Sequence, residues 1–348
     1  MCVCYVIRTF VFLFWCIVLT LQCIINMSYQ LESKRSILFL VNPKSGVQNK
    51  KMVPFYIEKY INRERYDFSI EYTQYAGHAA ELAASAAAEG FDAVVAVGGD
   101  GTVNEVGRSL AHTSTAMGVI PCGSGNGFAR HLGIPLTVKG AIDFINTAEP
   151  VAIDYGKLNG VPFFCSCGVG FDALVSDKFA NGGKRGMFTY IQRTLLDWVT
   201  YKPEIYEIEA ENVRRKYRAF VIACGNASQY GNNAYITPFA SMRDGMLSVS
   251  VLSPFTSLEV PLIVTQLFSN TLNVNSHMVT FCSRWIKIKR KSSGPVHYDG
   301  EPCTMDAELL VEAVPSGVNV LAKPGWDGTC VPMPMYKQFY DVVAGVVK

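Results

Sequence analysis

Short apolar runs alternate with longer amphipathic stretches up to about residue 148. Residues 37–41 and 94–97 are continuous apolar runs of strand length, and each ends in a turn rich in Gly, Asn or Asp, as a strand buried on both faces does. Strands that alternate with helices predict a doubly wound α/β domain with a mostly parallel sheet. The other elements expected here are strands near 68–73 and 118–121 and helices over 78–89, 103–112 and 127–131.

The pattern changes near residues 149–150, and strand-like segments dominate the rest of the chain. Several of them alternate apolar and polar residues, as half-buried antiparallel strands do. We therefore predict an α/β domain over 36–148 and a mostly antiparallel β domain over 149–326, with a tail over 327–348. The strands expected in the second domain are 151–159, 162–168, 205–210, 217–224, 247–252, 285–291 and 309–314, with helices at about 187–200 and 256–270.

Residues 1–26 form a strongly apolar segment whose only charged side chain is Arg8. The uncharged stretch over 9–25 is short for a membrane-spanning helix, and it lacks the basic start and small-residue cleavage site of a secretory signal. Met27 lies ten residues before the first expected strand. We therefore favour a chain that starts at Met27, with a membrane anchor and a cleaved signal as the alternatives.

Composition narrows the class of protein. The 348 residues carry a formal net charge of +2, which gives no electrostatic drive toward nucleic acid. The 11 cysteines include no Cys-x-x-Cys pair, so a zinc site and a disulfide framework have little support. Reduced, buried thiols in a cytosolic protein are the simpler interpretation.

The most informative turn is the sequence Gly98-Gly-Asp-Gly-Thr102, which directly follows an apolar strand. We expect Thr102 to open a helix, with Glu105 three residues later as its capping-box partner. Backbone amides at such a helix start bind phosphate oxygens, and glycines let the phosphates approach the backbone. Asp100 adds a carboxylate that suits a Mg²⁺ ion or the acceptance of a proton. The turn therefore indicates a nucleotide site, although glycines that serve packing alone are the alternative.

Two further loops follow expected strands. Residues 42–46 read Asn-Pro-Lys-Ser-Gly, and residues 123–126 read Gly-Ser-Gly-Asn. Ligands of open α/β sheets bind beyond the carboxyl ends of the strands, so these loops should converge. A strand-end turn and helix capping are the structural alternatives, and a solvated loop is the alternative for the basic pair at 184–185. The residues expected to hold the nucleotide are Asn42, Ser45, Gly98, Gly99, Gly101, Thr102, Gly123, Ser124, Gly125, Asn126, Lys184 and Arg185.

Four motifs occur in order along the chain: the three turns at 42–46, 98–102 and 123–126, and the sequence Asp299-Gly-Glu301. Together they resemble the diacylglycerol kinase catalytic domain superfamily, which includes bacterial lipid kinases and sphingosine kinases, over about residues 36–325. The resemblance implies an α/β domain related to NAD kinases and phosphofructokinases, then a β-sandwich for the lipid substrate, with the last segment returning to the first domain. It also implies transfer of the ATP γ-phosphate, with Mg²⁺, to a lipid hydroxyl by a cytoplasmic enzyme at the inner face of the membrane.

The resemblance also assigns roles to four carboxylates. A lipid hydroxyl is a weak acid, so a carboxylate should accept its proton during transfer. Glu301 matches the proposed base of bacterial diacylglycerol kinases, Asp100 matches the base favoured for sphingosine kinases, and we place Glu301 first. Asp244, in the sequence Asp-Gly-Met-Leu, matches an acid of a metal-linked network, in which Asp100 is the other expected metal residue. Asp172, in Gly-Val-Gly-Phe-Asp-Ala, matches a position that contacts the acceptor in sphingosine kinases.

The acceptor lipid and the exact class stay open on the sequence alone. Gly127 replaces an Asp found in many diacylglycerol kinases, which leans toward the long-chain-base branch. The basic run at 214–216 either contacts anionic lipid or forms a solvated hairpin tip. We expect ATP and a membrane lipid as partners, peripheral membrane contact, no nucleic acid, and compatibility with a homodimer. The alternative functions are an NAD kinase-like phosphotransferase, which shares Gly-Gly-Asp-Gly, and a non-catalytic nucleotide- or lipid-binding protein.

Overall fold

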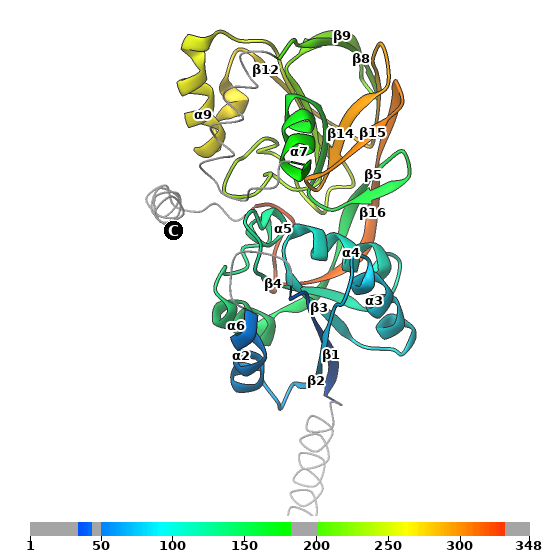
Figure 1. Cartoon of the computed structure of the whole chain (residues 1–348), viewed down its shortest axis with the longest axis vertical. Helices are drawn as coiled ribbons and strands as arrows, with labels where there is room; N and C mark the ends of the chain where they lie inside the picture. Colours follow the sequence, from blue (N-terminus) through cyan, green and yellow to red (C-terminus); the bar gives the residue numbers. More distant parts are fainter. Residues whose placement is uncertain (1–33, 44–49, 182–200, 331–348) are drawn as a thin grey trace, which may run out of the picture.

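An α/β half and a β half make up the molecule, and long strands run between them (Figure 1). The computed structural model describes residues 34–43, 50–181 and 201–330. The apolar segment at 1–26 and the helix expected at about 187–200 lie outside these ranges, as does the chain after residue 330. Within the described ranges, no helix is both long enough and apolar enough to span a bilayer.

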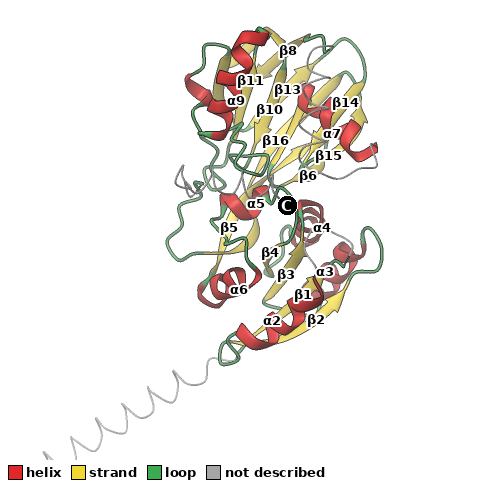
Figure 2. Cartoon of the chain, turned by 60° about the vertical axis from the view of Figure 1, so that its left-hand side comes forward, coloured by secondary structure: helices red, strands yellow, loops and turns green. Residues whose placement is uncertain are grey.

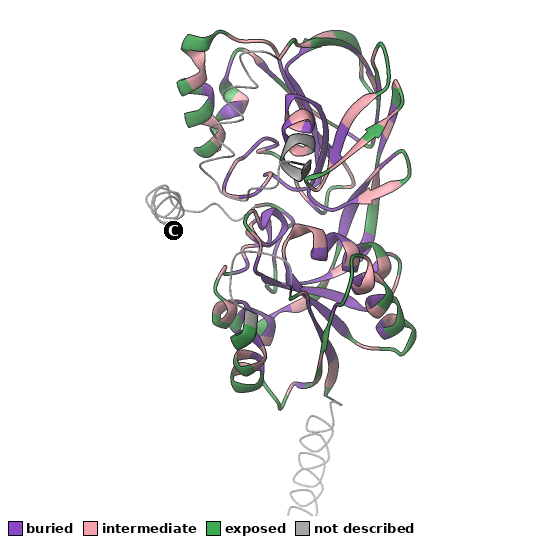
Figure 3. Cartoon of the chain, viewed as in Figure 1, coloured by how far each residue is buried: buried purple, intermediate pink, exposed green. Residues whose placement is uncertain are grey.

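Four parallel strands in the order β2-β1-β3-β4 form the centre of the α/β half. Every residue of β3 and β4 is buried, and Figure 3 shows these strands in the interior, as parallel strands covered on both faces must be. The predicted doubly wound sheet is therefore confirmed. The bounds are Arg35–Val41 (β1), Tyr66–Tyr72 (β2), Ala93–Gly98 (β3) and Ala116–Pro121 (β4).

Helices cover both faces of this sheet, with α3 and α4 on one side and α2 and α6 on the other (Figures 1 and 2). Their apolar faces and the sheet form one continuous core, in which Phe39, Ile57 and Val106 are fully buried. The bounds are Lys50–Met52 (η1), Val53–Tyr60 (α2), His78–Ala88 (α3), Asp100–Leu110 (α4), Gly127–His131 (α5) and Val138–Thr147 (α6).

Strand β16 (Glu308–Ala322) runs through both halves of the molecule. Its first part pairs with β13 (Trp285–Lys289), and its last part lies parallel to β4. β5 (Glu149–Leu158) pairs with it antiparallel on either side of a bulge, and the short β6 (Val161–Phe163) folds back on β5. The end of β16 thereby extends the sheet of the α/β half, and Trp326 packs in the core of that half.

The β half packs one end of this large sheet against a second, six-stranded sheet. All neighbouring strands of the second sheet are antiparallel, and apolar side chains of both sheets fill the space between them. The predicted β-sandwich is therefore confirmed. The strands are β8 (Glu204–Ala210) and β9 (Val213–Ala219) in the first sheet, and β7 (Ser166–Gly170), β10 (Val221–Gly225), β11 (Leu247–Leu252), β12 (Met278–Ser283), β14 (Gly294–Tyr298) and β15 (Glu301–Met305) in the second.

Two helices pack against the second sheet through a separate apolar cluster. This cluster includes Phe171 at the start of one helix, Ile263 in the other, and Phe220 between β9 and β10. The elements are α7 (Phe171–Asn181), η2 (Ser257–Glu259), α9 (Val260–Phe268) and η3 (Leu272–Val274).

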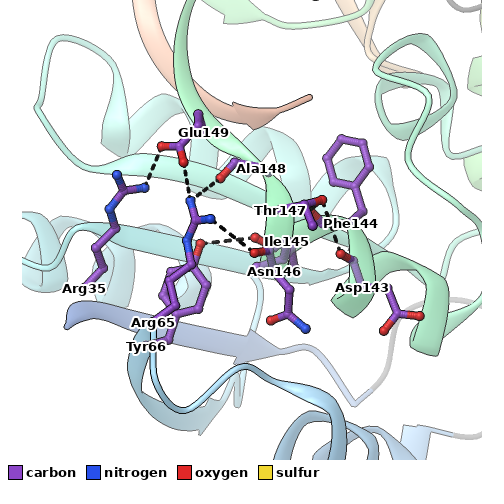
Figure 4. Close-up of polar contacts among 10 residues, drawn as sticks. All are labelled: Arg35, Arg65, Tyr66, Asp143, Phe144, Ile145, Asn146, Thr147, Ala148 and Glu149. Atoms are coloured by element: carbon purple, nitrogen blue, oxygen red, sulfur yellow. Dashed lines mark hydrogen bonds and ion pairs between the residues drawn. The ribbon is translucent and has the colours of Figure 1, made fainter. Parts of the chain in front are cut away.

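A polar cluster ties the amino ends of β1, β2 and β5 together (Figure 4). Glu149 forms ion pairs with Arg35 at 2.9 Å and with Arg65 at 2.6 Å. Arg65 also donates to the carbonyl oxygens of Asn146 and Ala148, at 3.2 and 2.6 Å. The cluster fixes the crossover from α6 into β5 at the sheet edge opposite the glycine loops, so it stabilises the scaffold without reaching them.

The sequence pattern misses three strands and twice predicts one strand where the structure has two. β12, β14 and β15 are not predicted, because few of their residues follow the apolar–polar alternation of a half-buried strand. The single strand predicted over 217–224 is wrong: β9 and β10 belong to different sheets, and the chain crosses between them at Phe220. The single strand predicted over 162–168 is wrong for the same reason, because β6 belongs to the first sheet and β7 to the second.

Candidate active site

Helix α4 begins at Asp100, before Thr102, at which the sequence predicts the helix to open. The predicted capping box between Thr102 and Glu105 is wrong, because both residues already lie inside the helix. Glu105 Oε1 instead accepts a hydrogen bond from the Gly77 amide at 3.1 Å, which joins α4 to the start of α3. Thr102 is buried, and its Oγ1 accepts from Asn42 Nδ2 at 3.1 Å. The loop after β1 is therefore attached to the first turn of α4.

The loops after β3 and β4 contact each other through their backbones. A Cβ atom on Gly123 would lie 2.6 Å from Gly99 Cα, and one on Gly98 would overlap the Thr102 side chain. The Cys122 amide also donates to the Gly98 carbonyl at 2.7 Å. A side chain at Gly123 would force the loops apart, and one at Gly98 would displace the first turn of α4. The carboxyl edge of β3 and β4 is thus lined by backbone, at the edge where such a sheet binds its ligand.

Asn126 closes the second of these loops. It adopts a left-handed conformation with φ of 51°, its Oδ1 accepts from the Gly123 amide, and its Nδ2 donates to the Gly123 carbonyl, both at 2.8 Å. Its own amide donates to Asp100 Oδ2 at 2.9 Å. The side chain therefore shapes the loop and does not cap α5. Ser124 is exposed at the tip of the closed loop.

The Asp100 carboxylate lies where α4 meets the closed loop. Burial raises its pKa to about 6, and the charge of nearby Asp299 adds to this rise. The backbone amides of residues 126–128 oppose the rise by donating to the carboxylate. The negative charge of Asp299 is therefore one reason why Asp100 holds a proton more readily than a free aspartate.

The hairpin between β14 and β15 turns at Asp299 and Gly300, which have φ of 47° and 83°. Two successive positive φ values define a type I′ turn, for which Asp-Gly is a preferred pair. The Asp299 carboxylate accepts from the backbone amides of residues 164–166, at 2.7 to 3.1 Å, and from Asn104 Nδ2 at 2.7 Å. Burial raises the pKa of Asp299 while these four donors lower it. Asp299 therefore anchors the hairpin to α4 and to the start of β7.

Glu301, the first residue of β15, is held by this hairpin over the first turn of α4. Its Oε1 lies 3.3 Å from the position that a Cβ would take on Gly101. Since Gly101 follows Asp100 in the chain, the two candidate bases both lie at the N-terminus of α4. Asn104 is not among the residues that the sequence predicts for the site, although its position four residues after Asp100 on one helix face is a usable signal.

Asp172, at the start of α7, lies in a nearly buried polar cluster of the second sheet. Its Oδ2 accepts from the Tyr230 hydroxyl at 2.7 Å and lies 2.9 Å from His297 Nε2. The loop of Tyr230 packs on the closed loop, since a Cβ on Gly231 would lie 2.8 Å from Gly125 Cα. His297 lies on β14, which leads into the hairpin. Tyr230 and His297 come from segments distant in sequence, and no local pattern indicates them.

Asp244 lies apart from these residues, in the turn before β11. Its Oδ1 accepts from the Met246 amide at 3.0 Å, and burial raises its pKa. Asp154 holds the turn by accepting from the amides of Gly245 and Ser316, both at 2.7 Å. Among the described residues, no three His, Cys, Asp or Glu side chains gather as a metal site, and the metal-binding roles of Asp244 and Asp100 stay predictions. The predicted nucleotide contacts outside the described ranges are Ser45, Lys184 and Arg185.

Known proteins share this arrangement of domains. Residues 36–158 match the diacylglycerol kinase catalytic domain, and residues 165–322 match the YegS C-terminal NAD kinase beta sandwich-like domain. Lipid kinase YegS of Escherichia coli (strain K12) is 30% identical over 256 residues, which are 71% of this chain and 84% of that protein. The chain belongs to the YegS family of lipid kinases. It is therefore a kinase, as its ordered motifs predict, and the NAD kinase-like and non-catalytic alternatives are set aside.

Other proteins of known sequence or structure agree with the YegS assignment. A probable lipid kinase YegS-like protein of Chromohalobacter salexigens is 30% identical over 264 residues, which are 74% of this chain and 84% of that protein. The crystal structure of a diacylglycerol kinase from Bacillus anthracis str. Sterne superposes with a TM-score of 0.66 at 20% identity, over 83% of this chain and 97% of that one. The likeness to this solved structure confirms the two-part fold.

In this YegS-family chain, His131 holds the helix that follows the closed loop. The side chain is fully buried, its Nε2 lies 3.0 Å from the Gly328 carbonyl, and its Nδ1 accepts from the Ser228 amide at 3.1 Å. A carbonyl only accepts, so Nε2 carries the hydrogen and the ring is neutral. Burial lowers the pKa of His131 to about 4.

We expect this histidine to make the protein less stable in acid. Between pH 6.5 and pH 4 the unfolded chain binds a proton at His131 that the folded protein does not, so the free energy of unfolding falls as pH falls through this window. From pH 7 to pH 5 the loss from this residue should be about 2 kcal/mol. Urea unfolding of wild type and His131→Gln at both pH values measures it. Equal pH dependence in the two proteins would contradict the prediction.

Proposed function

We propose that the protein transfers the γ-phosphate of ATP, with Mg²⁺, to a hydroxyl group of a membrane lipid. The observation that carries this proposal is that Glu301 and Asp100 both lie at the N-terminus of α4, beside the glycine-rich loops after β3 and β4. Phosphoryl transfer depends mainly on positioning and charge neutralisation, which such a site can supply.

The nucleotide would lie along the carboxyl edge of β3 and β4. Gly99 and Gly123 place no side chain between phosphates and the backbone there, and the N-terminus of α4 favours the negative charge of phosphates. Ser124, at the exposed tip of the closed loop, is placed for a side-chain contact. Lys184 and Arg185 remain predicted phosphate contacts, and Asn42 and Ser45 remain predicted nucleotide contacts.

The donor set at the start of α4 fits a magnesium ion. Mg²⁺ prefers oxygen ligands and keeps several waters, so one or two carboxylates together with phosphate oxygens suffice to bind it. Asp100 is the residue that would hold it here. When bound, Mg²⁺ would neutralise charge on the phosphates. We do not include Asp244 in this magnesium site, because its carboxylate accepts a hydrogen bond within its own turn. Its metal-binding role stays a prediction.

Glu301 would act as the general base. Its exposed carboxylate accepts the proton of the lipid hydroxyl while the hydroxyl oxygen forms its bond to the γ-phosphorus. The bond from that phosphorus to the bridging oxygen breaks, and ADP leaves. The Asp299 turn and Asn104 position Glu301, because four hydrogen bonds hold the hairpin that carries it.

The pairing of Asp172 favours an uncharged glycerolipid acceptor over a sphingoid base. The Tyr230 hydroxyl and His297 Nε2 already contact Asp172 Oδ2, the carboxylate oxygen with which an ammonium group would pair. An amine beside the reacting hydroxyl would instead pair with Glu301 and weaken it as a base. One solved neighbour, from Bacillus anthracis, is named as a diacylglycerol kinase, which agrees with this choice.

A labelled-ATP assay against defined lipids tests the proposal. Diacylglycerol, sphingosine and N-acylsphingosine are offered in the same mixed micelles, with and without Mg²⁺, and the products are identified by mass spectrometry. We expect Mg²⁺-dependent labelling of diacylglycerol, with kcat/KM at least about tenfold above that for sphingosine. Preference for sphingosine over its N-acyl form would contradict the acceptor choice, and labelling of no lipid hydroxyl would contradict the function.

A further inference from the structure

The outward side of helix α9 is apolar although it faces solvent. Leu258 of η2 is 92% exposed, and Leu262, Val264 and Phe268 of α9 are 54%, 44% and 37% exposed. Pro261 and Thr265, the other exposed residues of this side, are uncharged. Figure 3 shows the exposed colouring on α9, at the outside of the β half.

One neighbouring apolar residue extends this surface. Val274 of η3 is 72% exposed, and η3 is fastened to α9 by Asn275 Nδ2, which donates to Gln266 Oε1 at 2.6 Å. We call the combined surface the α9 face. It consists of Leu258, Leu262, Val264, Phe268 and Val274.

The inward side of α9 is apolar too. Ile263 is buried in the cluster that also contains Leu272, Met278 and, at the start of α7, Phe171. A helix that is apolar on both sides normally has cover on both sides. The described chain covers only one side, and apolar patches of this kind mark interaction surfaces.

The charges of this region suit a lipid surface. Between residues 253 and 283 the only Asp, Glu, Lys, Arg or His residues are Glu259 and His277, and they pair with each other at 2.8 Å. No unpaired acid would therefore be repelled by anionic headgroups. Uncharged polar residues border the face at Asn270, Thr271 and Ser276, where lipid headgroups would lie.

We propose that the α9 face docks on the lipid bilayer and brings the acceptor side of the enzyme to its substrate. The proposal rests on the proposed function, because the acyl chains of a lipid acceptor stay in the membrane. Continuity supports it: the apolar cluster beneath α9 reaches Phe171, the residue next to Asp172. An apolar face without basic residues binds by inserting its side chains into the headgroup–acyl boundary.

The test replaces one exposed leucine with an acid. Leu262→Glu is compared with Ile205→Glu, which makes a similar change at a 64% exposed position of β8 in the same half. Co-sedimentation with phosphatidylcholine–phosphatidylglycerol vesicles is measured without ATP, so the result does not depend on catalysis. We expect Leu262→Glu to weaken vesicle binding about tenfold or more, and Ile205→Glu to leave it unchanged.

Kinetics separate docking from damage to the active site. With a short-chain diacylglycerol dispersed in water, Leu262→Glu should keep wild-type kcat/KM, whereas with long-chain diacylglycerol in vesicles it should lose about tenfold. Leu258→Glu, at the most exposed position, should repeat the result, and thermal unfolding checks that each variant is folded.

Three outcomes would overturn the proposal. Vesicle binding by Leu262→Glu and Leu258→Glu equal to that of Ile205→Glu would show that the α9 face does not meet lipid. Conversion of a dimer to a monomer by Leu262→Glu, with vesicle binding unchanged, would show that a second copy covers the face. Loss of activity on the dispersed short-chain substrate would show that the substitution acts on the active site. If wild type bound vesicles through this face but phosphorylated no lipid, the proposed function alone would fail.

Discussion

We expect Asp100→Asn to abolish phosphoryl transfer while the protein stays folded. Asparagine keeps an oxygen that can accept from the Asn126 amide, so the closed loop stays attached to α4. The negative charge is lost, and with it the group that we expect to bind Mg²⁺. The substitution should therefore weaken the binding of Mg·ATP as well as the rate of transfer.

Stability provides an internal check on this variant. Burial raises the pKa of Asp100 in the folded protein to about 6, above the ordinary value of an aspartate. The folded protein then holds its proton more tightly than the unfolded chain, so ionisation at pH 7 lowers the free energy of unfolding. Removing the charge should not destabilise the protein, and the Asp100→Asn variant should unfold at a temperature equal to or above that of wild type at pH 7.

A matched control lies at the other end of the same strand. Asp92 accepts from the Ser36 amide at 2.7 Å, far from the glycine loops, so Asp92→Asn should keep its activity. Radiolabelled transfer and the binding of ATP at several Mg²⁺ concentrations are measured for both variants. A near-normal rate with normal Mg²⁺ dependence in Asp100→Asn would contradict the role assigned to this carboxylate.

The scaffold of the site could be predicted because its strands are buried on both faces. Such strands are continuous apolar runs, and the polar residues and glycines of the region then concentrate in the turns after β1, β3 and β4. Since ligands of such sheets bind at the carboxyl ends of the strands, the amino-acid sequence alone predicts that these turns converge. The contact between Gly99 and Gly123 agrees with that expectation.

The finer geometry depends on contacts that a local pattern does not carry. The capping-box interpretation of Thr102 and Glu105 is wrong, because a Thr and a Glu three residues apart can lie inside a helix as well as at its start. In the folded chain, Thr102 instead contacts Asn42 and Glu105 contacts Gly77. The motif at Asp299 also contains a signal for the hairpin itself, since Asp-Gly is a preferred type I′ turn pair.

The polar cluster around Asp172 could not be predicted from the sequence for a similar reason. Its partners lie 58 and 125 residues further along the chain. Only the pairing of β14 with β7 brings His297 beside the carboxylate. Sequence reasoning can identify the acid, but its state of pairing, which bears on the acceptor, appears only in the folded chain.

The second large effect is expected from Glu301→Gln, which preserves the shape of the side chain but removes the proton acceptor. A general base typically contributes about 10²–10⁴-fold to the chemical step, so kcat should fall within that range. ATP affinity should change little, because Glu301 reaches α4 from β15, a strand outside the glycine loops. Glu308→Gln serves as the control, since it removes only an exposed ion pair with Lys289.

Single-turnover rates and ATP binding in the two site variants separate the two carboxylates. If Glu301 is the base, Glu301→Gln binds Mg·ATP normally and transfers slowly even at saturation, whereas Asp100→Asn loses both properties. The opposite result, in which Glu301→Gln loses ATP binding but recovers its chemical rate at saturation, would make Glu301 a nucleotide or metal residue. Asp100 would then be the preferred base, since it is the other carboxylate at the start of α4 and its raised pKa, about 6, lies close to neutral pH.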